Sequence, residues 1–125
     1  MLVYLHGFAS SPASTKAQFF RARLAEAGAA LEIPDLAPDF THMTVTSQLA
    51  IVEALLTSDD TILLGSSLGG YLATLVAARH PTRVRGLVLF APAFGFAQRW
   101  EERIGPAALA RWRAAGTAPC FHYGR

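Results

Sequence analysis

Apolar and polar positions along this chain form two kinds of stretch, which alternate from the N-terminus to residue 90. Short, mostly apolar runs are typical of strands buried in a parallel sheet, and they cover residues 2–5, 30–33, 61–64 and 84–90. Longer stretches with apolar side chains at helical spacing lie between them, at residues 16–27, 46–56 and 68–79. Strands that alternate with helices predict βαβ units, right-handed crossovers and a parallel sheet with helices on both faces.

The first expected helix, at residues 16–27, has signals at both ends. Ser14 or Thr15 is a suitable N-cap, and Gly28 is well placed to stop the helix. We expect Phe19, Phe20, Leu24 and Ala27 to share one face of this helix.

Beyond residue 90 the pattern changes. Two short amphipathic helices with no strand between them are predicted at residues 96–103 and 106–114. We expect residues 94–114 either to form a helical lid or cap, or to pack directly against the sheet. In the run 84–90, residues 87–90 are apolar on both faces, which suits a central strand, so further strands are expected beyond it. We therefore interpret residues 1–125 as a single, incomplete domain, truncated after about four strands.

The strongest chemical signal is the segment GSSLG, which begins at Gly65 and joins the third predicted strand to the next helix. A serine with a glycine two places away on each side is typical of a sharp strand-to-helix turn that exposes a strained serine above the sheet. Gly65 and Gly69 leave room for the neighbouring strand and helix, and Gly70 extends that room. We expect Ser67 to be a nucleophile, and the N–H of Leu68 to supply half of an oxyanion hole.

Glycine-rich turns between a strand and a helix also bind phosphate in nucleotide-binding proteins. No lysine of the Walker type follows these glycines, and the Gly-x-Gly-x-x-Gly pattern is not formed. The serine nucleophile is therefore the better interpretation.

The expected sheet order brings a second segment to Ser67. With strand 30–33 at one edge, followed by the N-terminal strand and the two later strands in turn, strand order switches between the first and third strands. The turn at Gly7 then directs the N–H of Phe8 into the crevice at this switch, where Phe8 and Leu68 form a two-donor oxyanion hole. We expect His6 to anchor this loop rather than to act as a base, because serine, acid and histidine usually follow one another in that order along the chain.

The same crevice is expected to hold an acyl or aromatic group. Besides Phe8, the residues expected to line this pocket are Ser66, Tyr71, Pro92 and Phe94.

Composition and charge argue against several other kinds of function and binding site. The basic residues are almost all arginine and are scattered rather than clustered, so the net charge of +2 does not indicate nucleic-acid binding. The single cysteine, Cys120, allows neither an internal disulfide nor a cysteine metal cluster. No apolar run reaches about 18 residues and no basic leader precedes the first strand, so we expect a cytoplasmic protein with no membrane partner.

The segments HGF after the first strand and GSSLGGY after the third resemble the α/β-hydrolase superfamily. The longer segments YLHGFASSPASTKA and GSSLGGYLAT are similar to the small esterases of the YqiA/YcfP type. The resemblance extends through Ala93 and is weaker from Phe94 onward. It implies an α/β-hydrolase-like three-layer sandwich, with Ser67 as nucleophile and Phe8 and Leu68 as oxyanion donors. The resemblance also implies hydrolysis of short acyl esters, or acyl thioesters, with no metal and no cofactor.

One part of that family's machinery is not evident. Members place an acid and then a histidine on loops after later strands, whereas the candidates after Ser67 are limited to Glu101, Glu102, His80 and His122. His80 lies roughly 18 Å along the helix from Ser67, which excludes it as the base. A solvated helix face explains the two glutamates, and no acid stands before His122 to orient it. We therefore expect Ser67 to be a weak nucleophile in this chain alone.

These observations lead to one expected function and two alternatives. We expect a carboxylic ester hydrolase that forms an acyl-Ser67 intermediate from a small-molecule ester or thioester, impaired without its acid and histidine. The first alternative is a non-catalytic binding module that holds an acyl or aromatic ligand in the same crevice. The second is an acyltransferase, because an alcohol or amine can replace water in deacylation.

Overall fold

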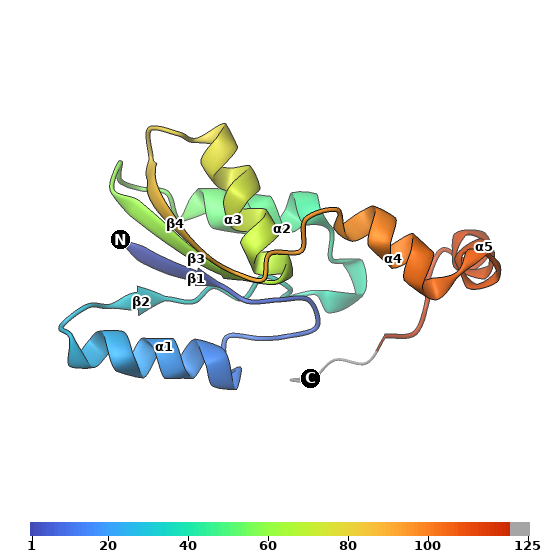
Figure 1. The fold of residues 1–125 in the computed structure, drawn as a ribbon, viewed down its shortest axis with the longest axis horizontal. Coiled ribbons are helices and arrows are strands. Elements are labelled where there is room, and N and C mark those ends of the chain that lie inside the picture. Colours follow the sequence, from blue (N-terminus) through green and yellow to red (C-terminus); the bar gives the residue numbers. More distant parts are fainter. Residues whose placement is uncertain (121–125) are drawn as a thin grey trace.

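The computed structural model describes residues 1–120, which form one sheet with helices on both faces (Figure 1). The strands are β1 (Leu2–Leu5), β2 (Leu31–Glu32), β3 (Thr61–Ser66) and β4 (Val84–Phe90). The helices are α1 (Thr15–Glu26), α2 (Val45–Ala54), α3 (Leu68–Arg79), α4 (Phe96–Ile104) and α5 (Pro106–Ala115), with a single 3-10 turn, η1, at Phe40–His42. Strands and helices alternate as far as β4, as the sequence predicts.

The sheet has the strand order β2-β1-β3-β4, and every neighbouring pair is parallel. This confirms the predicted order and the predicted α/β class. Because β2 is added on one side of β1 and β3 on the other, strand order reverses between β1 and β3, which is where open α/β sheets usually bind their ligands. Leu5 pairs with Gly65, so the carboxyl ends of these two strands meet at the same edge of the sheet.

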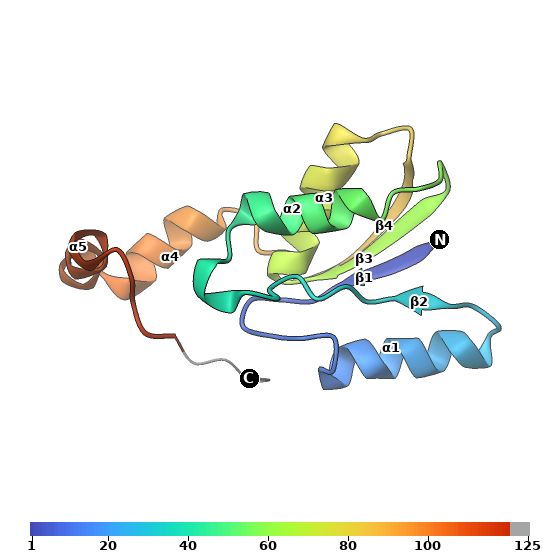
Figure 2. The ribbon, with the colours of Figure 1, turned by 180° about the vertical axis from the view of Figure 1, so that it is seen from behind.

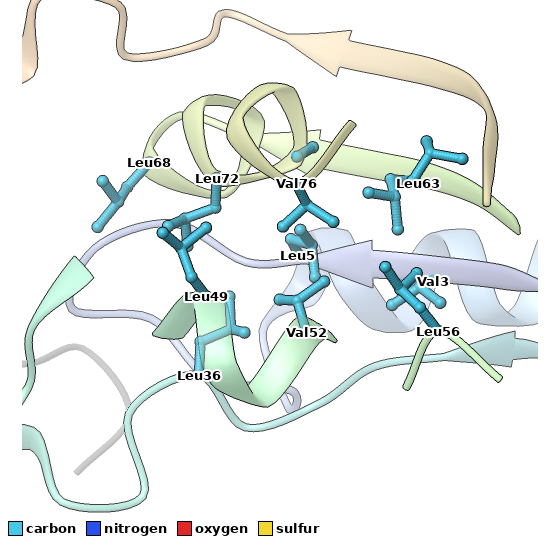
Figure 3. Close-up of a cluster of buried hydrophobic side chains, with 12 residues drawn as sticks. Val3, Leu5, Leu36, Leu49, Val52, Leu56, Leu63, Leu68, Leu72 and Val76 are labelled. Carbon is cyan, nitrogen blue, oxygen red and sulfur yellow. The ribbon is translucent and has the colours of Figure 1, made fainter. Parts of the chain in front are cut away.

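Side chains that alternate along the strands divide into two cores. Val3, Leu5 and Leu63 face α2 and α3 in the larger core, together with Leu49, Val52, Leu72 and Val76 (Figure 3). Tyr4 and Leu64 face the opposite side, where α1 covers them with Ala17, Phe20 and Leu24. Figure 2 shows the resulting three layers, with α2 and α3 on one face of the sheet and α1 on the other.

The ends of α1 agree with the sequence. The Ser14 side chain accepts a hydrogen bond from the backbone N–H of Ala17, at 3.4 Å, and Gly28 follows the helix with a φ of 78°. A positive φ at this place is typical of the residue that ends a helix, and glycine adopts it without strain.

The four apolar residues expected on one face of α1 are not buried together. Phe19 is 58% exposed, and Ala27, at the C-cap, is also exposed. Successive residues are about 100° apart around a helix, which places Phe19 about 200° from the fully buried Ala17. A helix that lies on a sheet buries one stripe of side chains, here the stripe of Ala17, Phe20 and Leu24.

Two strands differ in length from the expected runs. β2 pairs with β1 only at Leu31 and Glu32, and not over residues 30–33. β3 continues beyond the expected residues 61–64, because its last residue, Ser66, still pairs with Phe90 of β4. The longer β3 carries the chain directly into the turn at Ser67.

β4 lies at the edge of the sheet that the described residues form, and its apolar side chains are less covered than those of β3. Leu87 and Val88 are 36% and 41% exposed. The strand thus has the open, apolar edge that the sequence predicts if the sheet stops there. None of the helices within residues 1–120 combines the length and the apolar character needed to cross a membrane.

The core provides a first test. Leu72 of α3 is fully buried in the larger core, so Leu72→Ala should lower the free energy of unfolding by about 2–5 kcal/mol through the cavity it leaves. Phe19→Ala removes a larger but exposed side chain and should cost about 0.5 kcal/mol. Urea unfolding followed by circular dichroism measures both. Equal losses in the two variants would contradict the assignment of the core.

Candidate functional site around Ser67

Ser67 occupies the turn between β3 and α3 in a backbone conformation that is rare for residues other than glycine. Its φ is 53° and its ψ is −118°. Such a conformation costs of the order of 1–3 kcal/mol and persists only when the surroundings hold it in place. Here the Ser67 N–H donates to the Phe90 carbonyl at 3.0 Å, and the Ser67 carbonyl accepts from the N–H groups of Gly70, Tyr71 and Ala93 at 3.0–3.2 Å. The strained turn is therefore tied both to its own helix and to the end of β4.

The glycines around Ser67 are required by close packing. A Cβ on Gly65 would lie 2.6 Å from the Cα of Gly70, and a Cβ on Gly69 would lie 2.6 Å from the His6 carbonyl oxygen. A Cβ on Gly70 would lie 3.0 Å from the Cβ of Pro92, which is a tighter contact than most side chains tolerate. The start of α3 thus rests directly on the carboxyl ends of the strands, as expected for these glycines.

The loop after β1 passes next to Ser67. A Cβ on Gly7 would lie 3.4 Å from the Cβ of Ser67 and 4.0 Å from its hydroxyl oxygen, so the two backbones are in contact range. Phe8, the next residue, lines the same pocket as Ser67 and Leu68. Within residues 1–120, the backbone N–H groups of Phe8 and Leu68 make no hydrogen bond to another residue. Two donors therefore remain available beside the serine.

His6 holds this loop in place. The ring is 2% exposed; its Nδ1 lies 3.0 Å from the Gly7 carbonyl oxygen, and its Nε2 accepts a hydrogen bond from the Leu36 N–H at 3.1 Å. This pattern assigns the proton to Nδ1, which donates to the carbonyl. Both ring nitrogens thus join the loops after β1 and β2, which fits an anchor and leaves no nitrogen to serve Ser67 as a base.

Ser66 lies on the opposite side of the turn from the one we expected. Its side chain accepts a hydrogen bond from the Lys16 ammonium at 3.1 Å and also bonds the hydroxyl of Tyr4. Because side chains alternate along β3, Gly65 faces α3 and Ser66 faces α1. The pKa of the Tyr4 hydroxyl is raised above its usual value by burial, although the bond to Ser66 lowers it in part. Ser66 therefore helps to fasten α1 beneath the turn.

A pocket of about 500 Å³ opens beside Ser67, and helix α4 forms one of its walls. The pocket is lined by Phe8, Ser67, Leu68, Ala93, Phe96, Arg99, Trp100 and Arg103. An adjoining groove of about 910 Å³ shares Phe8, Leu68, Phe96 and Trp100 with it and continues between α2, η1, α4 and α5.

Aromatic rings hold α4 at this place. The ring of Phe8 lies 5.7 Å from Trp100, 6.5 Å from Phe96 and 5.8 Å from Phe40, measured between centroids. Such pairs contribute about 0.5–1.5 kcal/mol each beyond the area they bury. Phe8 is therefore the point at which the sheet edge, η1 and α4 meet.

Of the residues expected to line the pocket, Phe8 does so and the other four do not. Ser66, Tyr71, Pro92 and Phe94 are absent from the lining given by the described residues. Ser66 faces α1, Pro92 packs on Gly70, and the Phe94 side chain is 48% exposed. The lining residues that sequence reasoning missed are Phe96, Arg99, Trp100 and Arg103, all on α4. The signal was present in their spacing, which places them on one face of the helix, but the sequence does not say which surface that face meets.

None of the candidate acids and bases within residues 1–120 reaches Ser67. His80, at the far end of α3, lies 3.1 Å from Glu53, and this contact together with Arg79 lowers the pKa of the Glu53 carboxyl. Glu101 pairs with Arg113, and Glu102 accepts a hydrogen bond from Gln98. His122 lies outside the described residues. In the part of the chain that the structure describes, the pocket beside Ser67 is lined by neither a histidine nor a carboxylate.

A comparison with known protein families finds one whose model matches this chain. A family model described as "Uncharacterised protein family (UPF0227)" matches residues 1–124. This match extends over nearly the whole chain, including the region beyond β4.

Solved structures show the same fold. α/β-Hydrolase domain-containing protein 10 from mouse matches 94% of this chain at 23% identity, with a TM-score of 0.76. An extracellular α/β-hydrolase from a Paenibacillus species matches 73% at 22% identity and a TM-score of 0.64. A structure from work on the metagenome-derived lipolytic enzymes LipS and LipT matches 73% at 24% identity and a TM-score of 0.63. The chain spans 52%, 40% and 41% of these three chains, respectively.

The packing at the turn can be tested with two glycine variants. Gly69→Ala places a methyl group against the backbone of the strand ends and should lower the free energy of unfolding by about 3 kcal/mol. Gly86→Ala, in β4, meets only side-chain carbons of Ile62 at 3.7 Å or more, and should leave stability unchanged or raise it by about 0.5 kcal/mol. Chemical unfolding of both proteins decides the matter. A stable Gly69→Ala protein would mean that α3 starts farther from the sheet.

The buried Tyr4 predicts a loss of stability in alkali. The pKa of Tyr4 is raised in the folded state above its usual value of 10.0. Its contribution to the free energy of unfolding is therefore fully present below pH 10.0 and is lost as the pH rises from there through the raised pKa. Between about pH 8 and about pH 11, Tyr4→Phe should therefore lose less stability than the parent protein. Tyr71→Phe, a change at a half-buried tyrosine on α3, should keep the parent's loss. Urea unfolding at the two pH values provides the comparison, and identical losses in all three proteins would show that Tyr4 is not responsible.

Proposed function

The chain belongs to the family described as UPF0227 and has the α/β-hydrolase fold, and on this basis we propose that it acts as a serine hydrolase on acyl esters or acyl thioesters. The main support is the arrangement at Ser67. A serine with a φ of 53° lines a pocket together with Phe8 and Leu68, whose N–H groups have no acceptor among residues 1–120. This arrangement supports the proposal of a nucleophile elbow beside an oxyanion hole.

In the proposed reaction, Ser67 Oγ attacks the carbonyl carbon of the substrate. The carbonyl oxygen becomes an oxyanion that accepts hydrogen bonds from the N–H groups of Phe8 and Leu68. Removal of one such donor typically costs a factor of about 10²–10³ in kcat. The bond to the leaving group then breaks, the leaving alcohol or thiol takes up the proton that Ser67 lost, and water hydrolyses the acyl-Ser67 intermediate to a carboxylic acid and free serine.

The proton of Ser67 needs a base, and no residue in the described part of the chain lies in position to accept it. We propose that the complete site takes its histidine and acid from outside residues 1–120. Residues 1–120 would then supply the nucleophile, the oxyanion donors and the pocket. Their own activity would be limited to the modest rate enhancement that an oxyanion hole and binding give without a base.

The groove under α4 fits the acyl part of such a substrate. Its walls near Ser67 are formed by the rings of Phe8, Phe96 and Trp100, and farther along by Ile104 and Leu109. Apolar walls stabilise a hydrocarbon chain by about 25 cal/mol for each Å² that they remove from water. We therefore propose that α4 and α5, which extend beyond the carboxyl ends of the strands (Figure 1), cover the bound acyl group as a lid.

A second function is supported by the lack of a base beside Ser67 among residues 1–120. In a non-catalytic binding module, the same pocket and groove would hold an acyl or aromatic ligand without cleaving it. An acyltransferase would use the same Ser67 and release the acyl group to an alcohol or amine. In each case the proposed partner is a small molecule in the cytoplasm.

A fluorophosphonate probe tests the nucleophile directly, because it phosphonylates activated serines. In the natively expressed protein, where the proposed histidine and acid complete the site, intact-mass spectrometry should show one adduct, and the Ser67→Ala variant should show none. Ser66→Ala is the matched control, since it removes a hydroxyl from the neighbouring residue on the α1 side, and it should keep the adduct. A parent protein that takes no adduct would favour the binding module. An adduct that persists in Ser67→Ala would assign the reactive group elsewhere.

A further inference from the structure

Among residues 1–120, the charged side chains that line the Ser67 pocket are all positive. Arg99 and Arg103 both line it, and no aspartate or glutamate of residues 1–120 does. The other residues that line it are Ser67 and five apolar residues, Phe8, Leu68, Ala93, Phe96 and Trp100. A pocket of this composition has a positive potential next to the reactive hydroxyl.

Helix α4 directs both arginines to this pocket. Phe96, Arg99, Trp100 and Arg103 follow one another at spacings of three and four residues, which places all four on the same face of the helix. The aromatic pair anchors that face on Phe8, so the arginines between and beyond the two rings are carried to the pocket with it. Glu101 and Glu102 do not line the Ser67 pocket.

The carboxylates near these arginines have other partners. Glu101 pairs with Arg113 at 3.1 Å, and Glu102 accepts a hydrogen bond from Gln98 at 3.2 Å. Within residues 1–120, neither Arg99 nor Arg103 lies within ion-pair distance of a carboxylate, unlike Arg23, Arg79, Arg85 and Arg113. One guanidinium nitrogen of Arg99 donates to the Phe94 carbonyl oxygen, which orients the side chain and leaves other N–H donors unused.

We propose that Arg99 and Arg103 bind an anionic group, a carboxylate or a phosphate, on the leaving group of the substrate. Guanidinium groups stay charged at any physiological pH and match both anions with paired N–H donors. The larger groove shares the aromatic residues Phe8, Phe96 and Trp100 with the Ser67 pocket but is not lined by Arg99 or Arg103. The charged residues that do line it, Glu101 and Arg113, pair with each other. An acyl chain in that groove would therefore leave the alcohol or thiol half of the molecule facing Arg99 and Arg103. This inference rests on the proposed function and narrows its substrate class.

The test is a binding measurement, so that it does not depend on turnover. Amides replace the ester because they resist hydrolysis, and the probes form a matched set: para-(hexanoylamino)benzoate, para-(hexanoylamino)phenyl phosphate and the neutral para-(hexanoylamino)benzamide. Isothermal titration calorimetry of the full chain should show that at least one anionic probe binds about tenfold more tightly than the neutral one. The anion with the larger preference identifies the group as carboxylate or phosphate. Raising the salt concentration should reduce the preference, because both arginines are exposed.

Variants assign the preference to residues. The preference for the anionic probe should fall by about threefold in Arg99→Gln and by about threefold in Arg103→Gln. In the double variant this preference should disappear, while the affinity for the neutral probe stays the same. Arg111→Gln on α5 is the control, because Arg111 is exposed and lines neither pocket, and it should keep the full preference. Thermal unfolding verifies that each variant is folded. Equal affinity for all three probes in the parent protein would overturn the inference, as would a preference that survives in the double variant.

The result of this binding test can be distinguished from the result of the fluorophosphonate test of the proposed function. Ser67→Ala should retain the anion preference, because the arginines and not the hydroxyl bind the charge. If the fluorophosphonate adduct forms on Ser67 while the probes are not distinguished, the hydrolase stands and the anion site is wrong. If the probes are distinguished and no adduct forms, the anion site stands and the serine reaction is wrong.

Discussion

The close approach of α3 to the ends of β1 and β3 is the constraint on which the site depends. A Cβ on Gly65 or Gly69 would lie within 2.6 Å of neighbouring backbone, so no other residue fits without moving the helix. Because the helix begins directly above the strands, the chain must turn sharply after β3. That sharp turn gives Ser67 its positive φ and places it at the switch point between β1 and β3. The same approach brings the loop at Gly7 against Ser67.

Several weak contacts hold the strained turn. The Ser67 backbone is bonded to Phe90 and Ala93 at the end of β4, His6 joins the loops after β1 and β2, and Lys16 and Tyr4 meet at Ser66 on the α1 side. Each layer of the fold therefore contributes a support to one turn. Rigid elements that fix a reactive side chain from several directions are what a preorganised site requires.

The surroundings of Ser67 divide into parts with different structural origins. The serine and the two N–H groups that have no acceptor among residues 1–120 belong to the sheet edge and the start of α3, which the core fixes. The aromatic and charged walls belong to α4, which meets that core through the rings around Phe8. A change on α4 can thus alter which molecule fits without disturbing the turn. Function in a common fold is decided by such additions to the scaffold, and not by the scaffold itself.

The sequence alone determined the parallel sheet, its strand order and the turn at Ser67, because these follow from local signals: apolar runs, helical spacing and glycines at set distances from a serine. It did not determine which side chains reach the pocket. Ser66 was expected there, but strand alternation in a β3 longer than expected turned it toward α1. Phe19 was expected on the same helix face as Phe20 and Leu24 but points away from the sheet. The position of α4, and with it Arg99 and Arg103 beside Ser67, depends on aromatic contacts between residues about 90 positions apart, and no local pattern records such contacts.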